Sequence, residues 1–102
     1  MIVEISKSKK SNKKFDAVID KTKTVSFGAK GYSDFTIHKD EDRKERYIKR
    51  HKTNENWNDP TTAGFYAKRV LWNKPTMKES IDDLNKRFSK FKVSVKSVSR
   101  TE

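Results

Sequence analysis

Apolar residues alternate with polar ones in two short runs of the N-terminal half, a spacing typical of β-strands. The runs are FDAVI, over 15–19, and TKTVSF, over 22–27. Asp20 and Lys21 separate them, which predicts an antiparallel hairpin. We expect the lysines on one face of this hairpin and a buried apolar face made of Phe15, Val18, Val25 and Phe27.

The two ends of the chain carry few apolar residues. IVEI, at 2–5, is long enough for a short strand, but the Lys- and Ser-rich run that follows has no apolar period. We therefore expect a basic N-terminal arm over 1–14 and a compact domain over 15–90. Three valines interrupt a polar segment over 91–102, which predicts either a strand closing on the hairpin or a tail.

A change from acids to bases marks the first of three predicted helices, over 40–51. Acids occupy its first turn and bases its last, an order that complements the helix dipole. Asp42 and Arg46, like Glu45 and Lys49, are four residues apart and so are spaced for ion pairs. The apolar stripe is narrow, so we expect this helix on the surface of the domain.

Two further helices follow, and both are richer in apolar residues. The segment Asp59-Pro60-Thr61-Thr62 resembles a helix start, and from Ala63 to Trp72 apolar residues recur every three or four positions. Thr76 and Glu79 form a capping box before the third helix. The fold class is therefore α+β: a small domain with a short antiparallel sheet, two or three helices and basic extended termini. Core contacts between the helices are expected from Phe65, Leu71, Trp72, Ile81 and Leu84.

Charge and composition narrow the functional classes. The chain has 102 residues, a net charge of +11 and only 31% hydrophobic residues, so its core must be small. Cysteine is absent, which excludes disulfides and thiolate chemistry, and no apolar run is long enough for a membrane span. The basic excess is spread along the whole chain, and such a distribution fits DNA, acidic protein surfaces and anionic lipid about equally.

The spacing of reactive residues indicates no catalytic site, metal site, cofactor or small-molecule substrate. His38 and His51 have no second histidine at helical spacing, so packing and helix-end roles are expected. The glycines of 28–31 are not followed by the Lys-Ser/Thr of a P-loop and indicate a plain turn. A nuclease-like set could be formed by Arg43, Arg46, Arg50, His51 and Glu55. We prefer the interpretation that these charged residues make ordinary ion pairs on a solvated helix face, because no acidic pair stands in an apolar setting that would shift its pKa.

Bases interleaved with aromatic residues are typical of single-strand binders, although a small core needs most of these aromatics for packing. Charge alone selects the candidate residues for contact with a partner. They are Arg43, Arg46, Lys49, Arg50, Lys68 and Arg69.

The segments FG, DFT, HKD, RKERYI, TAGF, VLW, KPT and ESI lie between Phe27 and Ile81. In this order they resemble an uncharacterised family of small basic proteins from nucleocytoplasmic large DNA viruses of algae and protists. The resemblance implies a virion component, assembled in the host cytoplasm or the virus factory. Within that class we favour a minor capsid protein that binds capsid proteins of the same virus and cements the inner side of the shell. The alternatives are a basic protein that neutralises packaged DNA through non-specific phosphate contacts and a small nuclease-like enzyme.

Overall fold

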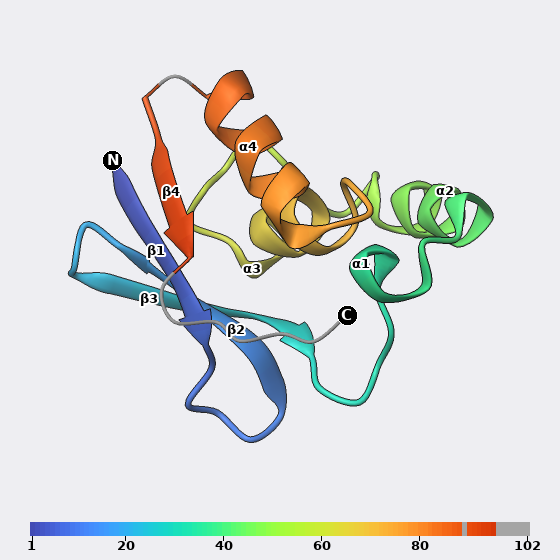
Figure 1. The fold of residues 1–102 in the computed structure, drawn as a ribbon, viewed down its shortest axis with the longest axis horizontal. Coiled ribbons are helices and arrows are strands. Elements are labelled where there is room, and N and C mark those ends of the chain that lie inside the picture. The colour runs from blue at the N-terminus through green and yellow to red at the C-terminus, as the bar shows by residue number, and fades with distance from the viewer. Residues whose placement is uncertain (89, 96–102) are drawn as a thin grey trace.

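A four-stranded sheet with helices packed against one face makes up the fold in our computed structural model, which describes residues 1–88 and 90–95 (Figure 1). The strands are ordered β3-β2-β1-β4. Neighbours among the first three are antiparallel, whereas β4 runs parallel to β1. The predicted α+β class is thus confirmed, with a mixed rather than an antiparallel sheet. The strands are β1 (Ile2–Lys7), β2 (Lys13–Ile19), β3 (Lys23–Ala29) and β4 (Lys92–Val95).

Strand β1 is an interior strand, although we expected a basic arm over 1–14. Val3 and Ile5 are fully buried, and β1 pairs with β2 on one side and with β4 on the other. Only Val3 and Ile5 point inward, so the alternation of apolar and polar residues is too short to predict a core strand. Hydrogen bonds to a neighbouring strand on each side stabilise this short strand in the sheet. The compact domain therefore includes residues 1–14. At the other end, β4 is the strand expected within 91–102, but it pairs with β1 and not with the hairpin, and residues 96–102 lie outside the described part.

The predicted hairpin is formed by β2 and β3, with a register that changes one expected core residue. Phe15 pairs with Phe27 and Ala17 with Val25, so the odd-numbered residues of both strands face the core. Val18 lies on the opposite face and is only half-buried, which corrects its expected place in the core. A one-residue offset along a strand always moves a side chain to the other face.

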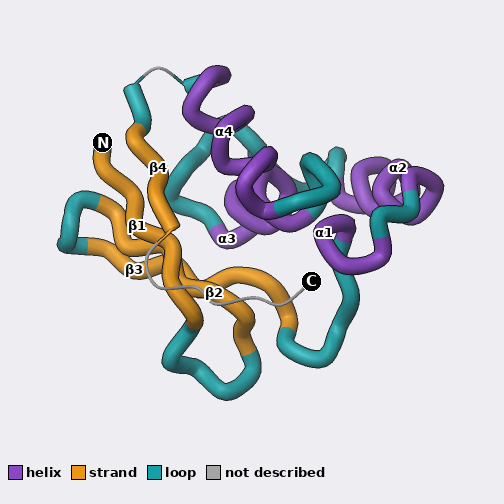
Figure 2. The backbone as a smooth tube through the Cα atoms, viewed as in Figure 1, coloured by secondary structure: helices purple, strands orange, loops and turns teal. Residues whose placement is uncertain are grey.

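The helical segments lie together on one side of the sheet (Figure 2). Three N-cap side chains, those of Asp40, Thr62 and Thr76, each accept a hydrogen bond from a backbone N–H two or three residues on. They begin the three predicted helices. In the described part of the chain no helix has the length and apolar character required to cross a membrane. The segments are α1 (Phe35–His38), α2 (Glu41–His51), α3 (Ala63–Tyr66), the π-helical η1 (Ala67–Leu71) and α4 (Met77–Arg87).

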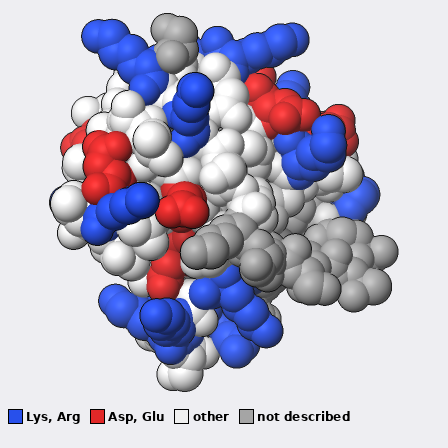
Figure 3. Space-filling model, turned by 60° about the vertical axis from the view of Figure 1, so that its left-hand side comes forward, with Lys and Arg blue, Asp and Glu red and all other residues white. Residues whose placement is uncertain are grey.

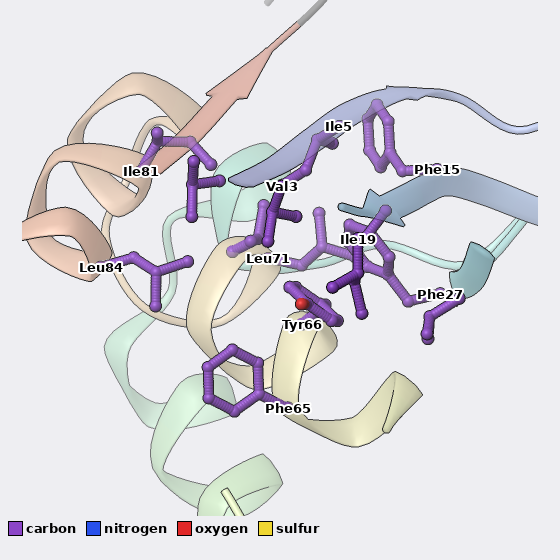
Figure 4. Packing of buried hydrophobic residues seen from close by; sticks show 14 residues of the cluster. Val3, Ile5, Phe15, Ile19, Phe27, Phe65, Tyr66, Leu71, Ile81 and Leu84 are labelled. Atoms are coloured by element: carbon purple, nitrogen blue, oxygen red, sulfur yellow. The ribbon is translucent and has the colours of Figure 1, made fainter. Parts of the chain in front are cut away.

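The core lies between the sheet and the helices α3, η1 and α4 (Figure 4). Phe65, Leu71, Ile81 and Leu84, expected as core contacts, are each at most 6% exposed. Trp72 is only partly buried and packs at the edge of this cluster. The edge position matters because it leaves one face of the indole ring for α2.

Candidate functional site

A cleft of about 480 Å³ opens where β2 and β3 meet α2, α3 and η1. Small residues keep this space open. Gly28 has φ of +77°, and a Cβ there would lie 2.8 Å from Leu71 Cδ1, so a larger residue would crowd the cleft. The Gly and Ala residues of the lining are Gly28, Ala29, Ala63, Gly64 and Ala67.

Four bases and two acids line the cleft, but only some of the bases are available to a partner. Lys14 Nζ lies 2.6 Å from the buried carboxylate of Asp34, which neutralises it. Arg43 and Arg50 are exposed and make no ion pair with another described residue. They are about 10 Å apart along α2, given its rise per residue. With Lys13 of β2, they leave the cleft positively charged.

The other two predicted contact residues of α2, Arg46 and Lys49, are exposed but do not line the cleft. Their expected ion pairs with Asp42 and Glu45 are not formed among the described residues. Exposed pairs of this kind gain typically less than about 1 kcal/mol, which does not offset the cost of ordering two long side chains. Helix α2 therefore carries two bases that line the cleft and two that do not, and none of the four makes an ion pair with another described residue.

Lys68 and Arg69, the remaining predicted contact residues, lie outside the cleft and pack against aromatic rings. Lys68 Nζ lies 5.3 Å from the ring centre of Trp57, and Arg69 Nε donates to the Trp57 carbonyl at 3.0 Å. The Arg69 guanidinium also lies 4.8 Å from the Phe88 ring centre. Burial lowers the pKa of Lys68. These two bases hold the loop before α3 against the domain.

On the face shown in Figure 3, Lys and Arg lie in separate groups, with acidic side chains between some of them. The even spread of charge along the sequence is thus also seen in space. Net charge alone therefore does not distinguish one binding face. The cleft is distinguished by its hollow shape and by lining bases that make no ion pair with another described residue.

A stack of aromatic rings borders the cleft and fixes α2. Tyr47 stacks on His51 with ring centres 4.3 Å apart and on Trp72 at 4.4 Å. His38 follows at 5.2 Å on Trp72. Burial raises the pKa of Tyr47 and lowers that of His38, so both rings favour their neutral forms. The sequence could not reveal the whole stack, because Trp72 lies far along the chain from His38 and Tyr47, the two rings that it contacts.

Tyr32 is a cleft residue that does not belong to the contact residues selected by charge. Tyr32 is 74% exposed and Ile37 is 48% exposed, whereas Phe35 of the same segment is buried. Ala29 accepts a hydrogen bond from the Tyr32 N–H, so the glycine-rich segment before Tyr32 is the plain turn that we predicted. The turn presents the Tyr32 ring at the cleft.

Glu55 contributes a carboxylate to the cleft. Its Oε2 is buried and has no hydrogen-bond partner among the described residues. The carboxylate approaches Gly64 so closely that any Cβ there would overlap it. An unmade hydrogen bond of a buried polar group costs about 1–3 kcal/mol, and more for a charged group. Such an oxygen is therefore a strong acceptor for a donor brought by a ligand.

Four members of the nuclease-like set line the cleft, namely Arg43, Arg50, His51 and Glu55. The fifth member, Arg46, lies outside it. The Nδ1 atom of His51 lies 2.9 Å from the Tyr47 carbonyl oxygen, and its ring is stacked on Tyr47. Both contacts fit a packing role for His51. Within the described residues, no group of three His, Cys, Asp or Glu is placed to hold a metal ion.

Comparison with known proteins adds one family. Residues 3–51 are similar to a family model described as "Family of unknown function (DUF5754)". No curated protein and no solved structure matches the chain. The matched segment includes the four bases of the cleft, whereas Glu55, Gly64 and Trp72 lie beyond it.

Proposed function

We propose that the chain is a non-enzymatic protein that binds single-stranded nucleic acid in the cleft beside α2. The observation that carries the proposal is that Arg43 and Arg50, which make no ion pair with another described residue, line the same open cleft as the exposed Tyr32. Guanidinium groups attract phosphates, and a free aromatic face stacks a base with a gain of about 1–3 kcal/mol. A base must be unstacked from its neighbours to enter a cleft, which favours single strands over duplexes.

We further propose that this binding takes place in the particle of a large DNA virus. The sequence pattern between Phe27 and Ile81 supports that setting. A basic protein with a positive cleft would there bind the phosphates of unpaired stretches of the packaged DNA. On sequence grounds the alternative to capsid cementing is a protein that neutralises packaged DNA through non-specific phosphate contacts. The presence of Tyr32 in the cleft supports a narrower form of that alternative, which is binding to unpaired strands.

The test is fluorescence anisotropy with a labelled single-stranded oligonucleotide and its duplex at two salt concentrations, about 50 and 200 mM. Two matched double variants of α2 remove the same charge: R43A/R50A from the cleft, and R46A/K49A from outside it. We expect R43A/R50A to weaken single-strand binding. The slope of log K against the logarithm of the salt concentration should become less steep by about 0.7 per lost phosphate contact. R46A/K49A should keep most of the affinity.

Equal losses in the two variants would show that binding follows net charge and would overturn the role of the cleft. Tighter binding to the duplex than to the single strand would also contradict the proposal. Running the same samples on a denaturing gel tests the non-enzymatic part, because shortened oligonucleotide would support the nuclease-like alternative instead.

A second candidate function is the minor capsid protein that cements the inner side of the shell. It is favoured by Arg46 and Lys49, which are exposed, lie outside the cleft and make no ion pair with another described residue, and so are open to the acidic surface of a capsid protein. Co-sedimentation with purified capsid shells of the virus tests it. Here the expected order is reversed: R46A/K49A should lose binding and R43A/R50A should retain it.

A further inference from the structure

Glu55 is the cleft residue that phosphate binding leaves unused. It lines the cleft with Arg50 and His51, yet Oε2 is buried and neither of these groups, nor any other described residue, donates a hydrogen bond to it. An ionised carboxylate only accepts hydrogen bonds. In a strand of DNA, the groups that can donate to it are on the edges of the bases, because the phosphates and the sugars inside the strand carry only acceptors.

We infer that the cleft selects guanine, with Glu55 accepting hydrogen bonds from the Watson–Crick edge of an unstacked base. The inference rests on the proposed function. In this arrangement the base enters the cleft beside Tyr32, and Arg43 and Arg50 hold the flanking phosphates. Gly64 is then a positioning residue, since only a residue without a Cβ leaves room for the Glu55 carboxylate.

The choice of guanine follows from the pattern of donors on each base. Guanine has two adjacent donors, N1–H and the N2 amino group, which match the two oxygens of one carboxylate. Adenine and cytosine have an amino group beside a ring acceptor, and thymine has N3–H between two carbonyl oxygens. In these three bases an acceptor faces the carboxylate of Glu55 and repels it.

The experiment compares three labelled pentamers by anisotropy: five thymidines, the same strand with a central guanine, and the strand with a central inosine. Inosine lacks only the N2 amino group and stacks much as guanine does. We expect the guanine pentamer to bind about fivefold or more tightly than the other two. Glu55→Gln should abolish that preference, and Glu45→Gln, which removes an exposed acid of α2 outside the cleft, should keep it.

Equal binding of the guanine and inosine pentamers by the wild-type protein would overturn the inference and leave the proposed function standing. Failure of every pentamer to bind would instead reject both. The inosine comparison uses only the wild-type protein, so it gives a result even if Glu55→Gln does not fold. Preference for guanine that persists in Glu55→Gln would also count against a role for Glu55.

Discussion

Tyr47 and Trp72 stack in parallel, with ring centres 4.4 Å apart and ring planes within 1° of each other. The pair joins α2 to the end of η1, and Trp72 in turn packs against the buried core. A second tie is the hydrogen bond from Lys44 Nζ to the Asn73 carbonyl at 2.6 Å. The wall of the cleft that carries Arg43 and Arg50 is therefore held by two contacts between distant segments of the chain.

Replacing Tyr47 with Ala should loosen this wall. We expect the free energy of unfolding to fall by about 3 kcal/mol, because a buried aromatic ring and its stacking partner are lost. Oligonucleotide affinity should fall as well, since the arginines of α2 are no longer held at the cleft. Urea denaturation and anisotropy measure the two effects. Tyr47→Phe keeps the stack and is the control, and equal stability of the two variants would contradict this account of α2.

Gly28 and Gly31 provide a matched pair of substitutions. Both have positive φ, +77° and +93°, but a Cβ at Gly28 meets Leu71 and Lys14 whereas one at Gly31 meets no atom within 4 Å. Gly31→Ala should cost about 1 kcal/mol of unfolding free energy, from backbone strain alone. Gly28→Ala should cost about 1–3 kcal/mol more, because it also overpacks the boundary between β3 and η1. Thermal or urea unfolding of both variants checks the difference, and equal costs would mean that the crowding at Gly28 relaxes freely.

Local signals in the sequence were sufficient for the helices and the hairpin. The N-caps Asp40 and Thr76 fix helix starts through atoms only two or three residues away, so their signatures are visible in the sequence. Strand β1 could not be predicted in the same way. It is stabilised by pairing with β4, about ninety residues later, through partners such as Val3 and Val93.

The candidate site was predictable only in part, for a related reason. Charge selected four of the five Lys and Arg residues of α2, but nothing in the sequence separates Arg43 and Arg50 from Arg46 and Lys49. Which of them line the cleft depends on how α2 packs on the domain, where Tyr47 stacks on Trp72, the residue after η1. The roles of Tyr32 and Glu55 likewise depend on which distant segments meet at the cleft.

His38 links α1 to the start of α2 and should make stability depend on pH. Its Nδ1 accepts a hydrogen bond from the Asp40 N–H at 2.9 Å, which requires this nitrogen to be unprotonated. Burial of the ring lowers the pKa of His38 below its ordinary value of 6.5, and the nearby Arg43 acts in the same direction. The folded protein thus binds a proton at His38 less readily than the unfolded chain does.

The sign of the effect follows from this difference in proton binding. Stability due to neutral His38 is fully present above the unfolded pKa and is lost as pH falls through the lower folded pKa. The unfolding free energy of the wild type should therefore decrease from about pH 6.5 toward about pH 5. His38→Asn should respond less, because Asn stays neutral and can accept the Asp40 N–H through Oδ1. Both proteins retain His51, so the difference between their urea denaturation curves across this range isolates His38. Identical pH dependence in the two would show that His38 does not hold α1 to α2 through its neutral form.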